Sequence, residues 1–379
     1  MPVSKKIFIA SLTILGILLI FLGIWQLNFR GKVDSQKTPA LQSDDKGETP
    51  LTKTSQANIK AISDKKVSFP FVDFSNSRIQ YYSQEAEAIS QMNLDGSAVK
   101  KLFTEGLTAL TDIVWAPNGT KAILKNGQGD TASYRYYNRD EEKAVPIKNI
   151  DAIVWQNINK IFYKYYDAKT QERSLNIANP DGSDWLKITD INSKKTLLAP
   201  IPKSGFVSTW NGADALAETT LEAIPFVGGE KKTIFTGKFG ADYVWNANGD
   251  TVLISHSDQK GGTKMQLAIA NEQGGEYKNL NIATFVSKCV WSKDNATIFC
   301  AVPDNFPATA VLPNDYLEGK IKTKDSFWKI NTKTGEKSSL INPTKIPVDM
   351  DASNLFINDQ DNMLIFLNKL DNKLYKLEL

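Results

Sequence analysis

A repeated pattern of apolar and polar positions runs through the chain from about residue 60 to its end. Three segments show it most clearly: DIVWAPNGTKAIL (112–124), DYVWNANGDTVLI (242–254) and KCVWSKDNATIFC (288–300). In each, an apolar pair ends in Trp, a polar turn follows, and a second apolar run begins. Apolar runs on both sides of a short polar turn predict a β-hairpin.

Weaker copies of this hairpin emerge when the spacing of the clear copies is applied to the rest of the chain. An apolar residue stands eight positions after each Trp, and the same spacing selects four further hairpins. The seven anchor positions are Phe74, Trp115, Trp155, Leu198, Trp245, Trp291 and Phe356. Five of their six intervals measure 40–47 residues, which is the length of one propeller blade. We expect one anchor per repeat to pack in the core between blades.

A second signature follows several hairpins, as an apolar-alternating strand that ends in a turn. It occurs in ISQMNLDGSAVKKL (89–102), LNIANPDGSDWLKI (175–188), LAIANEQGGEYKNL (267–280) and FWKINTKTGEKSSL (327–340). Asn begins each turn, and Gly supplies a positive φ. Hairpin, strand, turn and strand give four strands per repeat. We therefore predict an all-β fold, a seven-bladed β-propeller. Six blades are the alternative, because the copies at Leu198 and Phe356 lack the Trp.

These hairpins and turns resemble those of a known repeat family. The VWAPNG, VWNANG and VWSKDN hairpins, followed by N-x-x-G turns, are similar to the TolB-like, WD-repeat-like β-propeller family, whose repeats carry a W-S-P-D-G hairpin. The similarity covers about residues 60–379. It implies the fold and leaves the function open, because propellers serve as enzymes, scaffolds and receptors.

The two ends of the repeat region predict how the ring closes. The last repeat stops at Leu379 after three strands, and a spare strand-length segment, residues 57–66, precedes the first repeat. If this segment is the outer strand of the final blade, no unpaired sheet edge is left at the junction. The chain would then enter on the face that carries the PNGT-type hairpin turns.

The N-terminal residues predict a membrane anchor. Residues 7–25 are apolar except for Ser11 and Thr13, and as a helix they would span about 28 Å, close to a bilayer core of about 30 Å. We interpret residues 1–30 as a cytoplasmic stub and uncleaved signal anchor; a cleaved signal peptide is the alternative. Residues 31–58 are polar and predict a disordered linker, and 59–379 form the propeller. We expect a single-pass protein of the cell membrane with its C-terminal domain outside the cytoplasm.

Charge and histidine content exclude several function classes. The +3 net charge arises in residues 1–32, which hold four basic residues and no acid, so the remaining chain is close to neutral. A near-neutral domain without a basic run is a poor candidate for nucleic-acid binding. The single histidine, His256, argues against histidine-based metal sites and catalytic triads. We expect it in a loop after a strand, and we predict no cofactor and no metal.

The two cysteines predict a disulfide. Pairing Trp291 with Ile298 across the SKDNAT turn places Cys289 directly opposite Cys300 on the adjacent antiparallel strand. The separation of such pairs is compatible with a disulfide. An oxidising compartment favours that bond over two free buried thiols.

A long segment after the Trp291 hairpin is the candidate binding site. Residues 303–326 account for the one long interval, of 65 residues, and combine apolar side chains with acids and three prolines. Long, partly apolar loops often have a function; the alternative is a lid over the central channel of the ring. The candidate binding residues are Asp304, Phe306, Asp315, Tyr316 and Glu318.

Catalytic signatures are scarce. The chain has five arginines, too few for the arginine cluster of a sialidase-type propeller, and it lacks the S-x-D-x-G-x-T-W sequence boxes of that class. It also has no G-x-S-x-G motif. We expect a non-enzymatic extracytoplasmic binding scaffold of the cell envelope that presents its membrane-distal face to a protein or polysaccharide partner. The alternatives are a tethered carbohydrate-active enzyme that uses carboxylates in the propeller channel, and a purely structural envelope protein.

Overall fold

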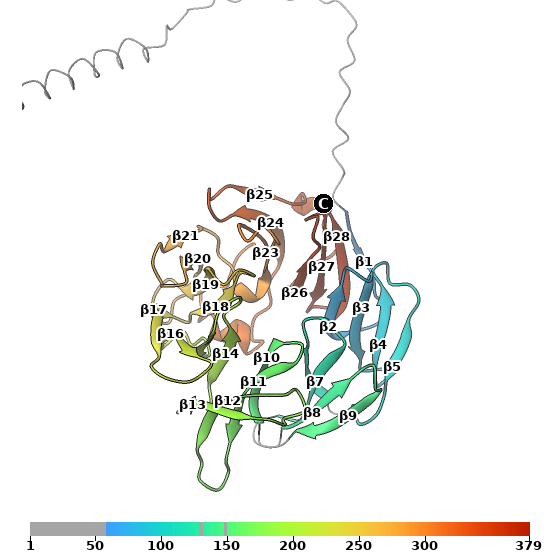
Figure 1. Ribbon diagram of the computed structural model, residues 1–379. Helices are drawn as coiled ribbons and strands as arrows, with labels where there is room; N and C mark the ends of the chain where they lie inside the picture. Colours follow the sequence, from blue (N-terminus) through green and yellow to red (C-terminus); the bar gives the residue numbers. More distant parts are fainter. Residues whose placement is uncertain (1–57, 109, 129–131, 148–149) are drawn as a thin grey trace, which may run out of the picture. The chain divides into compact units, whose positions relative to one another are not determined.

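Seven antiparallel sheets of four strands each follow one another around a ring (Figure 1). The computed structural model describes residues 58–108, 110–128, 132–147 and 150–379. Each sheet is one blade, and in six of the seven the strands lie side by side in chain order from the innermost strand outward; in the seventh the outermost strand is β1. The predicted seven-bladed, all-β propeller is confirmed, and the six-bladed alternative is wrong.

The strands of the first four blades have the following bounds. Blade 1 contains β2 (Ser68–Asp73), β3 (Arg78–Ser83), β4 (Ala88–Asn93) and β5 (Lys100–Phe103). Blade 2 contains β6 (Leu110–Trp115), β7 (Lys121–Asn126), β8 (Ser133–Asn138) and β9 (Lys143–Ile147). Blade 3 contains β10 (Ile150–Asn157), β11 (Lys160–Tyr166), β12 (Arg173–Ala178) and β13 (Leu186–Asp190). Blade 4 contains β14 (Thr196–Pro200), β15 (Phe206–Asn211), β16 (Glu218–Pro225) and β17 (Lys232–Phe239).

The remaining three blades include three short helical segments in their connections. Blade 5 contains β18 (Asp242–Trp245), β19 (Thr251–Ser257), β20 (Met265–Asn271) and β21 (Lys278–Asn279). Blade 6 contains β22 (Cys289–Trp291), β23 (Thr297–Pro303), β24 (Asp325–Asn331) and β25 (Lys337–Ser339). Blade 7 contains β26 (Ala352–Ile357), β27 (Met363–Asn368), β28 (Lys373–Glu378) and β1 (Asn58–Ala61). The helical segments are η2 (Val286–Lys288), α2 (Asn314–Leu317) and η3 (Pro343–Lys345).

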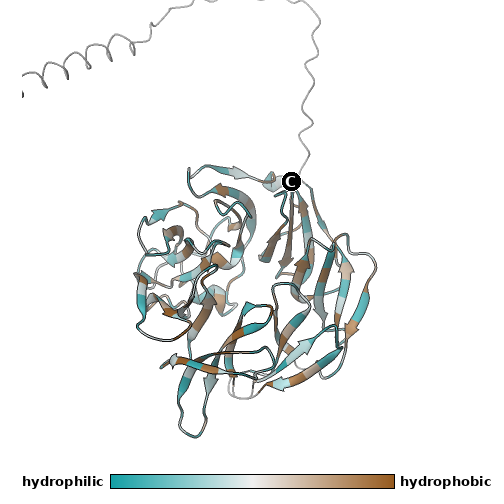
Figure 2. Ribbon diagram, viewed as in Figure 1, coloured by the Kyte–Doolittle hydropathy of each residue, from teal (hydrophilic) through white to brown (hydrophobic). Residues whose placement is uncertain are grey.

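The hydrophobic core is divided among the seven junctions between blades. Each of seven clusters of buried apolar side chains combines residues from two neighbouring blades, including the cluster that joins blade 7 to blade 1. Figure 2 shows hydrophobic residues along the strands and hydrophilic residues at the turns. Alternating side chains of one strand therefore contact opposite neighbours, and each blade is stabilised by burial on both of its faces.

The tryptophan anchors add a hydrogen bond to this apolar packing. The indole Nε1–H of Trp115 donates to the Phe69 carbonyl at 2.8 Å, and that of Trp155 donates to the Val114 carbonyl at 2.8 Å. Trp245 donates to the Ser208 hydroxyl at 3.0 Å. In every case the acceptor belongs to the preceding blade. The recurrence of Trp, rather than of any large apolar residue, therefore has a physical cause: it fills the junction and satisfies a polar group there.

Replacing Trp155 by phenylalanine tests this role. The variant keeps an aromatic ring but loses the bond to Val114, so we expect its free energy of unfolding to fall by about 1–2 kcal/mol. Chemical denaturation followed by circular dichroism measures the change. Trp185→Phe is the matched control, because Trp185 is 56% exposed. An equal loss in both variants would contradict the role of the bond.

The anchors predicted in blades 1, 4 and 7 lie one or two positions away from the true repeat position. Trp115 pairs with Ala122, seven residues later, and Trp245 and Trp291 pair with the same offset. The positions with this offset in blades 1, 4 and 7 are Val72, Pro200 and Ile357, in place of Phe74, Leu198 and Phe356. In blade 3, Trp155 pairs with Ile161, six residues later. The eight-residue spacing that the sequence comparison used differs from the seven-residue offset of the residues that pair across the turns in blades 1, 4 and 7. The three predicted residues still contact the inter-blade clusters.

The N-terminal strand closes the ring. β1 pairs antiparallel with β28, from Asn58 opposite Glu378 to Ala61 opposite Tyr375, and supplies the fourth strand of blade 7. The sequence predicted this outer strand. Closure buries Ile59 in the cluster between blades 6 and 7.

Two faces of the ring are distinguished by their connections. The hairpin face carries the turns between the first and second strands and between the third and fourth strands of a blade. The β26–β27 turn lies on this face, and β28 ends there, because the Leu379 amide bonds to the Asn362 carbonyl in that turn. β1 therefore begins on the hairpin face, since Asn58 lies opposite Glu378 at the end of β28. The opposite face, here called the insertion face, carries the turns between second and third strands and the connections between blades. It also carries the long segment after β23.

Glycine is required in the predicted turns that connect the third strand of a blade to the fourth. Gly96, Gly182, Gly274 and Gly335 all have φ between +78° and +88°. At Gly274 a Cβ atom would also collide with the carbonyl oxygen of Ile234 in the preceding blade. Both the backbone conformation and the space exclude larger residues there.

The predicted disulfide is confirmed. Cys289 on β22 lies directly opposite Cys300 on β23, and a disulfide joins them with a Cα–Cα distance of 4.1 Å. Among the described residues, no helix is long and apolar enough to cross a membrane. The predicted span, residues 7–25, and most of the predicted linker, 31–58, lie outside the described residues.

Candidate functional site

The long connection between β23 and β24 stands out from the repeated blades. It comprises residues 304–324, here called the insertion, and lies on the insertion face. Within it, the one-turn helix α2 is stabilised by Asp315, whose carboxylate accepts bonds from the Val311 amide at 2.7 Å and from Lys320 Nζ at 3.3 Å. The backbone is therefore held by local hydrogen bonds.

An apolar cluster fastens the underside of the insertion to blade 5. Tyr316 and Leu312 are buried against Phe285 and Met265, and Phe306 packs at the edge of the same cluster. The Tyr316 and Phe285 rings stack with centroids 4.4 Å apart. This eighth cluster is separate from the seven junction clusters, so the insertion has a small core of its own.

Hydrogen bonds to two further loops extend the attachment. The Asn314 side chain accepts from the Ala215 amide at 2.7 Å and donates to Asp214 at 3.1 Å, both in the β15–β16 turn of blade 4. The Leu312 amide donates to the Gly262 carbonyl of blade 5 at 3.0 Å. The insertion is thus attached to blades 4 and 5, which precede its own blade 6 in the ring.

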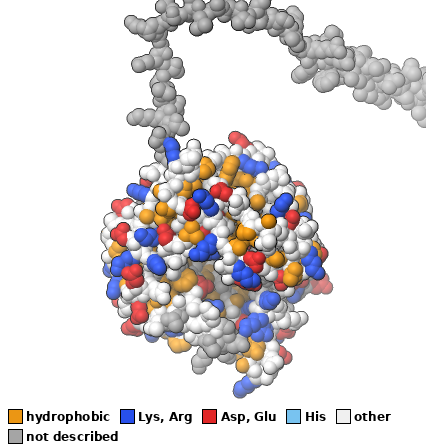
Figure 3. Space-filling view, turned by 180° about the vertical axis from the view of Figure 1, so that it is seen from behind, with side chains coloured by type: hydrophobic (Ala, Val, Ile, Leu, Met, Phe, Trp, Pro, Cys, Tyr) orange, Lys and Arg blue, Asp and Glu red, His pale blue; other side chains and the backbone are white. Residues whose placement is uncertain are grey.

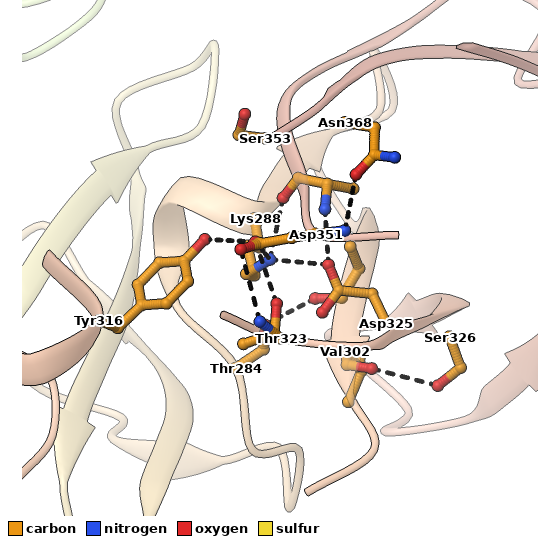
Figure 4. A network of polar contacts seen from close by, with 12 residues as sticks. Thr284, Lys288, Val302, Tyr316, Thr323, Asp325, Ser326, Asp351, Ser353 and Asn368 are labelled. Atoms are coloured by element: carbon orange, nitrogen blue, oxygen red, sulfur yellow. Dashed lines mark hydrogen bonds and ion pairs between the residues drawn. The ribbon is translucent and has the colours of Figure 1, made fainter. Parts of the chain in front are cut away.

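A buried ionic cluster attaches the insertion to blade 7, which follows blade 6 in the ring (Figure 4). Lys288 Nζ lies 2.7 Å from Asp325 Oδ2 and 2.7 Å from Asp351 Oδ1, and it donates to the Ala352 carbonyl at 3.0 Å. The Tyr316 hydroxyl donates to Asp351 at 2.8 Å. All three charged side chains are at most 1% exposed. They join the entrance to blade 6, the end of the insertion and the entrance to blade 7.

Burial acts differently on the two carboxyl groups of this cluster. Burial raises the pKa of Asp325 above its ordinary value despite the neighbouring Lys288. Burial also opposes ionisation of Asp351, but Lys288 and the Tyr316 hydroxyl outweigh it, so the pKa of Asp351 is lowered. Since none of these groups reaches solvent, the cluster holds the insertion in place rather than offering chemistry to a ligand.

The solvent side of the insertion face presents apolar side chains. Leu317 on α2 and Leu216 in the adjoining blade 4 turn are each 58% exposed, and Val348 before β26 is 46% exposed. Lys324 pairs with Asp349 at 2.8 Å and so connects the end of the insertion to the loop that carries Val348. Exposed apolar residues therefore sit on the insertion and on loops directly bonded to it.

The five predicted binding residues divide into two groups. Asp304 and Glu318 are exposed on the insertion, as a binding role requires, and Phe306 is half-buried against Phe285. Tyr316 is buried and Asp315 is half-buried, and both bond within the fold and hold the insertion together. The sequence could not separate these roles, because a short irregular segment has no periodicity that assigns an inner and an outer side.

The sequence predicted His256 in a loop, and this prediction is wrong. His256 lies within β19, because pairing with β20 continues to Ser257, and it is buried. Its Nδ1 is 2.7 Å from the Ser257 carbonyl and its Nε2 is 2.8 Å from the Tyr277 hydroxyl. A carbonyl only accepts, so Nδ1 donates and Nε2 accepts from Tyr277. This is a neutral, structural histidine.

Protonation of His256 should weaken the fold. Burial lowers the pKa of His256 below its ordinary value of 6.5, so the unfolded chain binds the proton more readily. The stabilisation is therefore complete above about pH 6.5 and is lost as pH falls towards the folded pKa. Denaturant titrations at pH 7.5 and 5.5 should show a larger loss in the wild type than in His256→Gln. An equal loss of unfolding free energy between pH 7.5 and 5.5 in both proteins would contradict the assignment of His256 as a neutral, structural histidine.

Other chemistry finds little support in the described ranges. Within residues 58–108, 110–128, 132–147 and 150–379, no group of three His, Cys, Asp or Glu side chains is placed to hold a metal ion. Two half-buried carboxyl groups on innermost strands, Asp112 and Asp242, have pKa values raised by their partial burial. The Asp242 carboxylate accepts from the Trp210 indole at 3.0 Å, which is a contact within the core.

Comparison with known proteins shows the fold alone. No protein-family model matches the chain, and no curated protein matches its sequence. An oligogalacturonate lyase from Vibrio parahaemolyticus matches with 10% identity and a TM-score of 0.60, over 87% of this chain and 96% of that one. The β-propeller domain of Cps50 (Swd1) from Myceliophteria thermophila matches with 8% identity and a TM-score of 0.54, over 85% and 99%.

TolB from Acinetobacter baumannii is also similar to this chain. The match has 10% identity and a TM-score of 0.45, over 74% of this chain and 64% of TolB. The seven four-stranded blades and the matches to the lyase and to the Swd1 domain confirm the resemblance noted in the sequence as a β-propeller repeat fold; membership of a particular propeller family is not shown.

Proposed function

We propose that this protein is a non-enzymatic, extracytoplasmic binding scaffold of the cell envelope, anchored through residues 7–25. Its insertion face binds a protein or polymer partner. The observation that carries the proposal is the attachment of the insertion: four blades hold it from beneath, while Leu317 is left exposed on its outer side.

Such a surface suits binding for an energetic reason. Association costs free energy when loops must be ordered at the interface, and a segment that is already ordered avoids that cost. The buried Lys288 cluster and the stacked Tyr316 ring provide this order before any partner arrives. Exposed apolar side chains with polar neighbours then form a small centre of the kind that carries most of the binding energy.

The position of the chain entry agrees with this orientation. β1 begins on the hairpin face, and the insertion lies on the opposite face. The described chain therefore begins on the face opposite the insertion. If residues 7–25 anchor the protein, their deletion should move it from the membrane fraction to the soluble fraction.

Surface charge supports a protein or polymer partner rather than nucleic acid. Figure 3 shows acidic and basic side chains interspersed among hydrophobic ones on the face that it draws. Phosphate backbones require a concentration of basic side chains. Mixed charge with scattered apolar residues is more typical of surfaces that bind proteins or neutral polymers.

The experiment compares two matched variants of the full-length chain. Leu317→Asp places a charge on the insertion, whereas Val227→Asp places one on the hairpin face, where Val227 is 92% exposed. We expect Leu317→Asp to lose most of the envelope component that the wild type retains on affinity capture, and Val227→Asp to retain it. Equal retention by both variants, or no retained envelope component, would count against the proposal.

The tethered carbohydrate-active enzyme remains the second candidate because of Asp112 and Asp242. Carboxyl groups whose pKa is raised by burial are frequent at catalytic sites, and both lie on innermost strands, β6 and β18. Turnover of a glycan substrate that disappears in Asp112→Asn and Asp242→Asn would favour this candidate over the scaffold.

A further inference from the structure

A groove on the propeller lies away from the insertion, on the hairpin face between blades 2 and 3. It has a volume of about 490 Å³. Strands β8 and β9 of blade 2 form one wall, and the β10–β11 and β12–β13 turns of blade 3 form the other (Figure 1). The groove therefore uses a junction between two blades rather than the central channel.

Three polar side chains in this groove have no partner within the described part of the chain. They are the Tyr136 hydroxyl, the Asn159 amide and the Lys143 ammonium group. Asn159 and Lys143 are exposed, whereas the Tyr136 ring is half-buried against the core between blades 2 and 3. The groove thus offers donors and acceptors that the fold itself does not use.

The other polar groups of the groove are fixed by their own turns. Asn138 donates to Glu141 at 2.7 Å, and Asn179 donates to the Ser183 hydroxyl at 2.9 Å. Asp181 accepts from both the amide and the hydroxyl of Ser183. Their geometry is set in advance, so a ligand would meet ordered walls.

Apolar surface accompanies these polar groups. The ring of Tyr136, Val145 and Pro180 all line the groove. An aromatic ring beside amides and carboxylates can contact an apolar sugar face while its neighbours bond to the hydroxyls around it. A ligand with alternating C–H faces and hydroxyl edges satisfies both kinds of wall.

The charges of the side chains that line the groove disfavour an anionic ligand. Glu141 and Asp181 oppose the single cation, Lys143. Burial raises the pKa of Tyr136, and nearby Glu141 and Asp181 raise it further, so the phenol stays a donor at neutral pH. We infer that this groove binds a neutral oligosaccharide, with Tyr136 and Asn159 as its main contacts. The site is independent of the insertion face.

Isothermal titration of the full-length chain with chitohexaose and with cellohexaose tests this site. We expect at least one of the two sugars to bind. Tyr136→Phe and Asn159→Ala should each weaken it about tenfold, the effect of one lost hydrogen bond to the ligand. Tyr136→Phe keeps the ring that packs on the core, so its fold should be preserved, as unfolding curves will check.

Two controls separate this inference from the proposed function. Asn305→Ala lies in the insertion, where Asn305 is exposed, and should leave the sugar affinity unchanged. Leu317→Asp should also bind sugar like the wild type, whatever happens to capture of the partner. The inference is overturned if neither sugar binds, if the Tyr136 and Asn159 variants match the wild type, or if only a hexalysine peptide binds the groove.

Discussion

Replacing Lys288 by methionine should lower the free energy of unfolding by about 3–5 kcal/mol, because it leaves two buried carboxylates without their counter-ion. Lys288 is fully buried and contacts both Asp325 and Asp351. Methionine fills a similar volume, so loss of charge and hydrogen bonds dominates the effect. Urea unfolding followed by tryptophan fluorescence measures the loss. Hydrogen exchange should also become faster in the insertion.

Two further variants show whether the penalty is electrostatic. Lys320→Met removes a lysine that also pairs with an acid but is 62% exposed, and it should change stability by less than about 1 kcal/mol. Adding Asp325→Asn and Asp351→Asn to Lys288→Met should recover part of the stability, because no charge then remains buried. A Lys288→Met protein as stable as the wild type would show that the cluster does not hold the insertion.

Replacing Ile59 by alanine should lower the free energy of unfolding by about 2–5 kcal/mol. Ile59 is the buried residue of the four-residue strand β1 and packs in the cluster between blades 6 and 7. Besides leaving a cavity, the substitution weakens the only strand that covers the outer edge of β28 in the described sheet of blade 7. Amide exchange in β28 should therefore increase more than in the central strands of other blades.

Lys60→Ala is the matched control for this closure. Lys60 occupies the next position of β1 and is exposed, so its loss should change stability by no more than about 0.5 kcal/mol. If Ile59→Ala left exchange in β28 unchanged, β1 would contribute packing without closing the ring.

The repeated fold could be predicted because its cause is local. A Trp followed by a polar turn and an apolar run encodes a hairpin, and its indole bond to the preceding blade explains why Trp recurs. The same argument failed by one or two positions at Phe74, Leu198 and Phe356. In blade 7, for example, both Phe356 and Ile357 have an apolar residue eight positions later, so this spacing does not fix which of them occupies the repeat position.

The attachment of the insertion could not be predicted, because its cause is not local. Lys288 lies before β22, Asp325 at the start of β24 and Asp351 before β26. The three meet only when blades 6 and 7 are packed. The sequence located the insertion and its mixed composition, but it gave Tyr316 a binding role, whereas the Tyr316 ring and hydroxyl are buried. Neighbouring Leu317 is the exposed side chain. Tyr316 and Leu317 are adjacent on the one-turn helix α2, and only the orientation of this helix decides which of the two side chains is buried.

The two faces of the ring separate two proposed activities. The insertion face combines an ordered, partly apolar surface with attachments to blades 4 to 7. The hairpin face, where the described chain begins, carries the polar groove around Tyr136. A scaffold with this arrangement could hold a partner on one side and a sugar polymer on the other, and variants on each face should affect one without the other.

Photo-cross-linking from the two faces tests the central claim most directly. A benzoylphenylalanine introduced at Leu317, and separately at Val227, reports which face contacts a partner in intact cells, since both side chains are exposed. We predict a discrete cross-linked product from position 317 and none of that size from position 227. A product from position 227 alone, or from neither position, would contradict the assignment of the insertion face as the binding surface.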